Sequence, residues 1–366
     1  MKRITIFIVF SLSVINLFRF WFFNIERFSR RFNPEYFSKL YSQSQYVLGP
    51  KSVGGIGDDG LYAFAGYYYF FQGGDVSAVN FEHPPLGKYL IGLSIFLFNN
   101  ENMINIIYFL LLLVLVYKTA RLYLGKYQSL LPLTILMTDP LFLDHTIRSQ
   151  LDLPFSLFFL AGVYFYILHF TNRKMIYLSQ LFWSFAFATR FFPFLAVLEA
   201  FMLILVLYKN KRNLFSFISS LCLIPLVYLL SHLSFFIYHP SLIEFLRHKK
   251  WMLAWFTGTP IRTGNILRNI YTGWLFDSQG FLVKNKEWSP IQPVTVFLSI
   301  LPFAKNPLYG FAALYFLYTV MATGGQAKFL MPVYPIMAIL AVNNCQAVYC
   351  IICQWMRLKL QTSKAR

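Results

Sequence analysis

The sequence predicts an all-α polytopic membrane protein that forms a single integral membrane domain over residues 1–366. Hydrophobic residues make up 57% of the chain and charged residues only 13%, whereas an ordinary soluble domain is roughly 25% charged. Aromatic residues account for 20% of the chain, and the mean hydropathy is +0.54. These values exclude a soluble globular protein and an intrinsically disordered one.

Apolar runs that approach the length of a membrane span recur along the chain. A spanning helix needs about twenty mostly apolar residues, and about ten runs come near this length: 4–23, 103–117, 128–143, 153–170, 175–189, 191–208, 214–238, 294–304, 307–323 and 329–355. The run 294–304 is short, so as a span it would be tilted, extended or re-entrant. The run 85–99 is interpreted as a juxtamembrane or re-entrant helix. We therefore expect about ten transmembrane helices, with juxtamembrane helices in the first long outer loop.

The distribution of charge predicts how these helices are threaded. The start, Met1-Lys2-Arg3 and an apolar run, resembles a secretory signal but lacks a small-residue cleavage site, so we expect a retained first span that enters from the cytoplasm. The pieces that then face the cytoplasm carry 15 Lys and Arg residues and no Asp or Glu: 1–3, 118–127, 171–174, 209–213, 305–306 and 356–366. This bias follows the positive-inside rule. All 14 acidic residues then lie outside or within the membrane, which predicts acid–base chemistry on the outer face.

Two long segments remain on the outer side, 24–102 and 239–293. The formal net charge of +18 would favour nucleic-acid binding in a soluble protein. Here the cations sit in short clusters between apolar runs, where membrane orientation accounts for them. We therefore expect no nucleic-acid partner and look for site residues in the outer segments.

The first outer segment carries two groups of residues suited to chemistry. Four glycines flank Asp58 and Asp59, so the backbone of this loop can approach a ligand closely. No Gly-Lys-Ser/Thr follows, which excludes a Walker-type nucleotide loop. Glu82, His83 and Lys88 then place an acid, an imidazole and an ammonium beside two prolines. A solvated turn is the alternative for the first group, and an interfacial helix cap for the second.

A third group lies at the outer turn that follows 128–143, and it contains Asp139, Asp144, His145, Arg148 and Asp152. A buried acid near the centre of a spanning helix costs about 2.5 to 3.5 kcal/mol, so such residues normally face a polar cavity. Arg148 and Asp152 are four apart and would share a helix face, with a structural salt bridge as the alternative.

Basic and aromatic residues interleave in the second outer segment, around 247–255. This pattern suits lipid headgroups and sugar faces, and it suits an ordinary interfacial belt equally well.

The motifs together resemble a known family, the polyprenyl-phosphate-sugar glycosyltransferases of the C superfamily, and specifically glycosyltransferase family 39. Asp58, Asp59 and Tyr62 stand where the family has Asp-Glu and a following Tyr, with Asp59 in place of Glu. The family's His-Pro-Pro-Leu-Gly-Lys is intact from His83 to Lys88. This family includes the dolichyl-phosphate-mannose protein mannosyltransferases.

Two further stretches carry the resemblance. Asp139-Pro140, Arg148 and Leu151-Asp152 are similar to the mannosyltransferases' second outer patch, with the Arg displaced by one residue. The stretch from Lys328 to Pro335 resembles the family's motif Arg-Tyr-Leu-Leu-Pro-x-Tyr-Pro. Lys328 stands in place of the Arg, which keeps the positive charge but loses the two parallel hydrogen bonds that a guanidinium donates. The similarity covers about 50–170 and recurs at 323–340, and no segment resembles the soluble outer domain of the eukaryotic enzymes.

The resemblance implies a C-superfamily glycosyltransferase architecture and transfer of a sugar from a polyprenyl-phosphate carrier to an acceptor hydroxyl, with inversion. The candidate sugars are mannose or another hexose, and the acceptor is a protein, a lipid or a glycan. Because a phosphate is already a good leaving group, one base and a cationic clamp suffice. Asp58 is the predicted base. The predicted substrate-binding residues are Asp59, Tyr62, Glu82, His83, Lys88, Asp139, Arg148, Asp152, Arg190, Arg262 and Lys328.

No metal ligands are predicted. Asp58, Asp59, Glu82 and His83 are hard or borderline ligands, which leaves a divalent metal open, but they lack a recognised ligand spacing. A transporter or flippase of lipid-linked saccharides is the alternative from another class, in which the charges would line a conduit. The compact length and the missing outer domain favour a multi-pass protein of a prokaryotic plasma membrane, surrounded by membrane lipid, with its site on the outer face.

Overall fold

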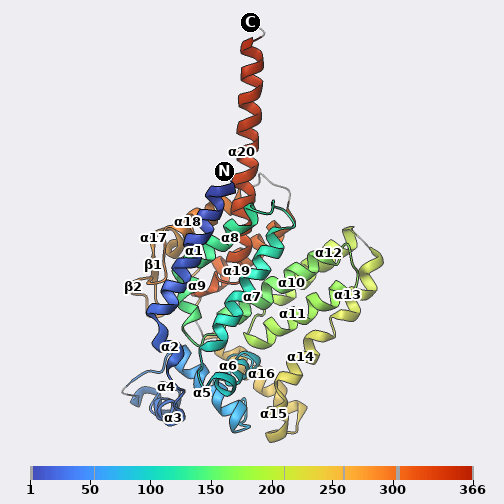
Figure 1. The fold of residues 1–366 in the computed structure, drawn as a ribbon. Helices are drawn as coiled ribbons and strands as arrows, with labels where there is room; N and C mark the ends of the chain where they lie inside the picture. The colour runs from blue at the N-terminus through green and yellow to red at the C-terminus, as the bar shows by residue number, and fades with distance from the viewer. Residues whose placement is uncertain (1–2, 53, 210, 259, 302–305, 365–366) are drawn as a thin grey trace.

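The computed structural model describes residues 3–52, 54–209, 211–258, 260–301 and 306–364. Helices dominate these residues, and the only strands among them form one small hairpin (Figure 1). Four described stretches are long and apolar enough to cross a membrane: Arg3–Phe23, Met103–Ala120, Lys211–Ser231 and Tyr334–Met356. Six shorter apolar helices accompany them: Leu86–Phe98, Gln128–Thr138, Asp152–Leu168, Met175–Thr189, Ile291–Ile300 and Leu308–Ala322. The predicted fold class, an all-α polytopic membrane protein, is confirmed.

The helices of the bundle follow one another largely in the predicted order. They are α1 (Arg3–Phe23), α7 (Met103–Ala120), α8 (Leu131–Thr138), α9 (Pro140–Thr146), α10 (Asp152–Leu168), α11 (Met175–Thr189), α12 (Leu195–Lys209), α13 (Leu214–Ser220), α14 (Leu223–Ser231), α15 (Leu233–Tyr238), α18 (Ile291–Ile300), α19 (Leu308–Ala322) and α20 (Tyr334–Lys364). In Figure 1 both chain ends lie at the upper side of the bundle, and the helices of the first outer segment, 24–102, lie at its lower side.

Three predicted spans differ in detail from the helices. The run 128–143 is interrupted at Asp139, because Pro140 disfavours helical backbone at the residue before it. The run 214–238 divides into α13, α14 and α15. The Ser231 hydroxyl donates to the Tyr228 carbonyl at 2.7 Å next to one of these breaks, and such side-chain bonds compete with the helical ladder.

The last predicted span, 329–355, begins only at Tyr334, because the 3-10 turn η4 (Ala327–Phe329) and Pro332 precede it. The run 294–304 gives α18, which ends at Ile300, and residues 302–304 of that run lie outside the described part of the chain.

The first outer segment folds into short helices, named α2 (Ile25–Ser29), α3 (Pro34–Ser42), α4 (Gln45–Leu48), η1 (Gly49–Lys51), α5 (Asp58–Phe71) and α6 (Leu86–Phe98). Two glycines bring α5 and α6 into backbone contact. A Cβ on Gly66 would lie 2.6 Å from the Lys88 carbonyl oxygen, and a Cβ on Gly92 would lie 2.5 Å from the Gly66 carbonyl oxygen. Because a larger residue would clash at either position, this crossing fixes α5, which begins with Asp58, against α6.

The second outer segment contains α16 (Leu242–Thr257), α17 (Asn265–Thr272) and an antiparallel hairpin of β1 (Trp274–Phe276) and β2 (Leu282–Lys284). The Asn265 amide nitrogen donates to the carbonyls of Phe276 at 2.8 Å and Gly324 at 2.7 Å. The Asn265 amide oxygen accepts from the Phe276 backbone N–H at 2.9 Å. One side chain thus ties the hairpin to the connection that leads from α19 to η4.

The main core lies where α10 and α11 pack against each other. Trp183 is fully buried, and a Cβ on Gly162 would come within 2.7 Å of its indole ring. The Ser179 hydroxyl also donates to the Gly162 carbonyl at 2.8 Å. This packing sets the start of α10, at Asp152, and the end of α11, directly before Arg190.

Candidate active site

The predicted base, Asp58, forms an ion pair with Lys328. Asp58 is the first residue of α5, and Lys328 lies in η4. The Lys328 Nζ donates to Asp58 Oδ2 at 2.6 Å. Burial acts to raise the pKa of the Asp58 carboxyl, but the Lys328 ammonium and the weaker influence of Arg190 outweigh it, so this pKa lies below its ordinary value. Asp58 is therefore ionised at neutral pH and can accept a proton.

A second ion pair, between Arg190 and Asp152, stands beside the first. Arg190 follows α11 and its guanidinium donates to Asp152 Oδ1 at the start of α10. The same guanidinium lies 4.9 Å from the centre of the Phe329 ring, next to Lys328. His145 Nε2 lies 3.9 Å from Asp152 Oδ2. Asp152 therefore positions Arg190 beside η4, and two cations act on Asp58.

Lys88 closes the loop that carries Glu82 and His83. Its ammonium is fully buried and donates to the Asn80 carbonyl at 2.5 Å, the Asn80 side-chain oxygen at 3.0 Å and the His83 carbonyl at 2.7 Å. These contacts use all three N–H groups of an ammonium. Lys88 is thus placed to hold the loop in shape.

Glu82 and His83 face the Asp58 side of the site. The His83 ring meets the Tyr62 ring edge-on, with 6.1 Å between the ring centres. Burial, with the positive charges of Arg190, Lys88 and Lys328, holds the pKa of His83 well below its ordinary value, so the imidazole is neutral. Burial is also the main cause that raises the pKa of Glu82, and the Asp58 carboxylate adds to it.

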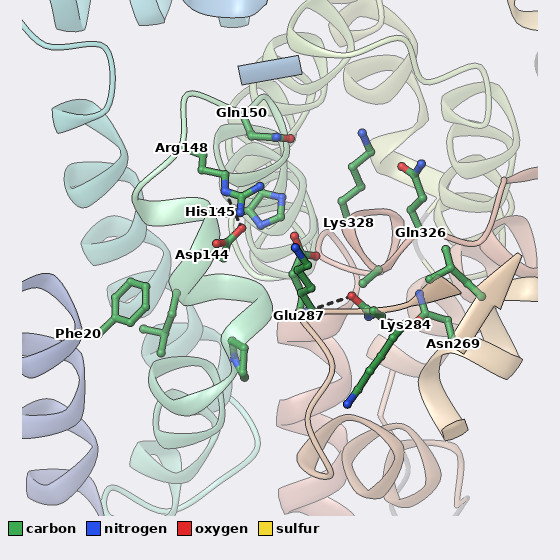
Figure 2. Close-up of a pocket in the computed structure, with 16 residues that line it drawn as sticks. Phe20, Asp144, His145, Arg148, Gln150, Asn269, Lys284, Glu287, Gln326 and Lys328 are labelled. Atoms are coloured by element: carbon green, nitrogen blue, oxygen red, sulfur yellow. Dashed lines mark hydrogen bonds and ion pairs between the residues drawn. The ribbon is translucent and has the colours of Figure 1, made fainter. Parts of the chain in front are cut away.

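A pocket of about 580 Å³ adjoins this group (Figure 2). Its wall comes from α9, from the end of the hairpin and from the η4 connection. Four cations line it, namely Arg148, Lys284, Lys286 and Lys328. Arg148 Nε lies 3.0 Å from Asp144 Oδ2. The pocket suits an anionic ligand because its walls are rich in cations, and it reaches Asp58 through Lys328.

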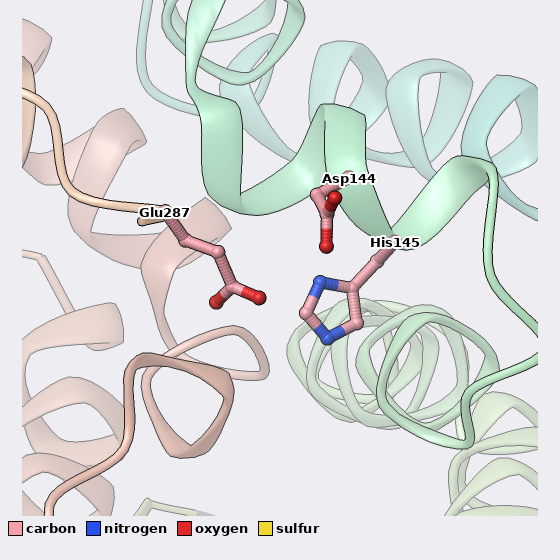
Figure 3. A group of neighbouring side chains, drawn as sticks. All are labelled: Asp144, His145 and Glu287. Carbon is pink, nitrogen blue, oxygen red and sulfur yellow. The ribbon is translucent and has the colours of Figure 1, made fainter. Parts of the chain in front are cut away.

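Asp144, His145 and Glu287 meet in the wall of the same pocket (Figure 3). One potential ligand atom from each lies within 4.8 Å of the others. Burial, followed by the Asp144 carboxylate, raises the pKa of Glu287 to about 7. Burial lowers the pKa of His145 to about 3, so its imidazole is neutral.

The structure places three predicted substrate-binding residues in other contacts. Asp59 Oδ1 accepts from the Gly60 N–H at 3.0 Å, and Asp59 lines a separate pocket of about 150 Å³. Asp139 is fully buried, caps α9 and accepts from Gln292 Nε2 at 2.9 Å. The Arg262 guanidinium donates to the Ser278 carbonyl at 3.1 Å. These contacts shape the outer segments around the site.

The residues considered as metal ligands from the sequence were Asp58, Asp59, Glu82 and His83. No three of these described residues bring ligand atoms within 4.8 Å of one another. The group whose ligand atoms do lie that close is Asp144, His145 and Glu287. The sequence prediction omits Glu287, and it also omits two lysines that line the pocket, Lys284 and Lys286. A lone acid directly after two lysines was the only hint of Glu287 in the sequence, since no motif surrounds it.

The bundle has a fold that is also seen in two solved structures of a membrane protein, ArnT. The crystal structure of ArnT from Cupriavidus metallidurans in the apo state has this fold, with a TM-score of 0.56 and 15% identity, over 79% of this chain and 55% of that chain. The structure of ArnT from the same organism bound to undecaprenyl phosphate matches with a TM-score of 0.53 and 16% identity, over 91% of this chain and 59% of that chain. The chain therefore spans somewhat more than half of the ArnT chain.

The predicted family resemblance is also confirmed. Residues 82–241 match the family described as dolichyl-phosphate-mannose-protein mannosyltransferase. This match begins at Glu82, directly before the His-Pro-Pro motif, and covers the Asp139 to Asp152 group. No curated protein matches the chain.

Proposed function

We propose that this protein is an integral membrane glycosyltransferase that transfers a sugar from a polyprenyl-phosphate carrier to an acceptor hydroxyl. The observation that carries the proposal is the ionised Asp58 carboxylate, held 2.6 Å from the Lys328 ammonium at the edge of a basic pocket. The family match and the ArnT fold support it. Mannose or another hexose is the proposed sugar.

In the proposed reaction the acceptor oxygen displaces the phosphate at the anomeric carbon with inversion. Asp58 takes the hydroxyl proton as the oxygen attacks, a role that contributes about 10² to 10⁴ in rate. The C–O bond to the phosphate breaks, and the charge on the departing lipid phosphate is met by Lys328, Arg190 and Arg148. These cations accelerate the step because negative charge gathers on the phosphate as it leaves.

The remaining predicted residues support these groups. Asp152 holds Arg190, and Lys88 holds the loop with Glu82 and His83. We assign Tyr62, Glu82 and His83 to the wall of the sugar site beside Asp58. Asp59, Asp139 and Arg262 keep the surrounding segments in place.

We place the site on the outer face of a prokaryotic plasma membrane. The segments predicted to face the cytoplasm carry 15 Lys and Arg residues and no acid, which the positive-inside rule assigns to the inner side. The helix α5, which begins with Asp58, and the helix α6 lie at the side of the bundle away from both chain ends (Figure 1).

Transfer from a radiolabelled polyprenyl-phosphate sugar to candidate acceptors tests the proposal. The purified wild-type protein is expected to release free carrier phosphate together with a labelled product, and Asp58→Asn is expected to lose at least about 100-fold in kcat. Unchanged transfer by a folded Asp58→Asn protein would remove Asp58 as the base. Movement of intact labelled lipid across a vesicle, without release of carrier phosphate, would instead favour a flippase.

A further inference from the structure

A small cavity of about 150 Å³ lies beside the basic pocket. The segment 147–150 forms a wall of both, because alternate side chains along it line the small cavity (Ile147 and Ser149) and the basic pocket (Arg148 and Gln150). The proposed sugar transfer uses the basic pocket for the phosphate of the donor. The small cavity is therefore a separate space that a second ligand can fill.

The small cavity adjoins the start of α5. Gly57 and Asp59, the two chain neighbours of Asp58, line it. The Ser149 hydroxyl donates to the Asp59 carbonyl at 2.9 Å, so the shared wall is attached to the start of this helix. A group bound in the cavity would lie next to the proposed base without taking the place of the reacting hydroxyl.

Two buried polar residues that follow α6 line the cavity with oxygens that lack a partner. Glu101 is 2% exposed and Asn102 is 3% exposed. The Arg30 guanidinium donates to Glu101 Oε1 at 2.6 Å, but Glu101 Oε2 and Asn102 Oδ1 are buried without a hydrogen-bond partner. Because a buried acceptor without a partner is costly, these two oxygens suit a ligand that donates hydrogen bonds.

The charges around the small cavity balance one another. Arg27 and Arg30 supply two positive charges, Asp59 and Glu101 supply two negative charges, and the other lining residues are uncharged. The basic pocket instead carries four cations against two acids, so an anion is favoured there and an uncharged ligand in the small cavity. A hydroxyl group both donates and accepts, so a polyol can bond to the free oxygens and to the guanidiniums together.

We propose that the small cavity anchors one sugar unit of an uncharged saccharide acceptor, next to the unit whose hydroxyl reacts at Asp58. Tyr36, which is 55% exposed, also lines the cavity, and its ring offers an apolar face to the C–H groups of a sugar. This inference rests on the proposed function and assigns its acceptor to the saccharides, either free or as the headgroup of a glycolipid.

Saturation-transfer NMR on the full chain, without donor lipid, tests the cavity with neutral disaccharides of glucose, of mannose and of galactose. The detergent must carry no sugar headgroup, because such a headgroup would compete for the site. The wild type is expected to bind at least one of these disaccharides saturably. Glu101→Gln is expected to bind it at least about tenfold more weakly, because an amide nitrogen that only donates replaces an oxygen that accepts.

Glu35→Gln is the matched control, because Glu35 is an exposed acid of the same outer segment that does not line the cavity. If Glu101→Gln fails to fold, Tyr36→Ala serves in the same measurement and should weaken binding about threefold. Asp58→Asn should bind the disaccharide like the wild type. The proposal is overturned by a wild type that binds none of the disaccharides saturably, or by equal binding in Glu101→Gln.

The transfer assay then compares three acceptors: the bound disaccharide, a glycolipid that bears it, and a serine peptide. Either saccharide form should be glycosylated, and the form with the lower KM identifies the source of the acceptor. Glu101→Gln should raise the KM for the saccharide at least about tenfold and leave the KM for the donor lipid unchanged. Transfer to the peptide alone would overturn the inference, whereas saccharide binding without transfer to any acceptor would contradict the proposed function and leave the saccharide site in place.

Discussion

At the scale of single residues, the site depends on how charges are paired. Lys328 and Arg190 both act on Asp58, and each cation is held by a carboxylate. The sequence predicted Asp58, Asp152, Arg190 and Lys328 as site residues, but it did not show which acid would pair with which cation. Such pairs set the protonation state of Asp58, so single substitutions among them should change pH dependence as well as rate.

Lys328→Met should move the acid limb of kcat/KM to higher pH. Burial acts to raise the pKa of Asp58, and Lys328 is the main group that lowers it. Without the ammonium the carboxyl is protonated at higher pH and fails as a base there. Loss of the cation should also reduce kcat by at least about 100-fold.

The pH profile of transfer by the purified variant checks this, with Lys39→Met on exposed α3 as the control. An acid limb at the wild-type position in Lys328→Met would show that the ion pair does not govern Asp58.

The His83 pKa predicts how stability changes with pH. The folded pKa lies well below the ordinary value, so between the two values the unfolded chain binds a proton that the folded chain does not. The contribution of His83 to the free energy of unfolding is then fully present above about pH 6.5 and is lost as the pH falls below that value. Thermal unfolding in detergent from pH 8 to pH 5 should show a falling Tm, with a shallower fall for His83→Gln. The partly exposed His239→Gln serves as the comparison, and an identical slope in His83→Gln and wild type would contradict the assignment.

At the scale of elements, backbone breaks and close crossings place the site residues. The interruption of the run 128–143 at Asp139 turns α9 so that Asp144 and His145 face the pocket. The pair Asp139-Pro140 is a sequence feature that indicates a helix break, because Pro disfavours helical backbone at the residue before it. The crossing of α5 and α6 at Gly66 and Gly92 could not be predicted from the sequence, because no local pattern shows which helix a glycine will contact.

Gly66→Ala should destabilise the protein by about 1–3 kcal/mol, because an added Cβ in a tight contact forces backbone shifts. The Cβ would lie 2.6 Å from the Lys88 carbonyl oxygen, so α5 and its first residue, Asp58, would move away from Lys328. A lower Tm together with reduced transfer is expected.

Gly54→Ala is the matched control for this substitution, because a Cβ there would meet no atom within 4 Å. Equal Tm values for Gly66→Ala and Gly54→Ala would argue against the close crossing.

At the scale of the whole molecule, the site joins three regions of the chain. Asp58 comes from the first outer segment, Asp144 and Arg190 from the bundle, and Glu287 from the second outer segment. Asn265 is the main tie between the second outer segment and the connection to η4, through the Phe276 and Gly324 carbonyls. Its substitution should therefore loosen the pocket without affecting the core.

Asn265→Ala should cost about 1–3 kcal/mol locally, because it leaves buried polar groups without partners. Hydrogen exchange is expected to speed up in residues 274–284 and to stay unchanged in α10 and α11. The KM for the donor should rise, because Lys284, Lys286 and Glu287 line the pocket. Thr263→Ala in the same segment is the control, and protection of the hairpin as strong as in the wild type would refute the role of Asn265.

The sequence by itself determined the membrane class and the order of most helices, and it predicts that the first outer segment supplies the base. These follow from local properties: apolar run length, proline positions and the separation of acidic from basic residues along the chain. The family motifs likewise marked Asp58, Asp152 and Lys328. Only the tertiary structure decided that Lys328 pairs with Asp58 and that the Lys88 ammonium donates all its hydrogen bonds within its own loop. It also decided that Glu287 lies beside Asp144 and His145. Each of these outcomes depends on contacts between residues far apart in the chain, and residue type and spacing carry no information on such distances.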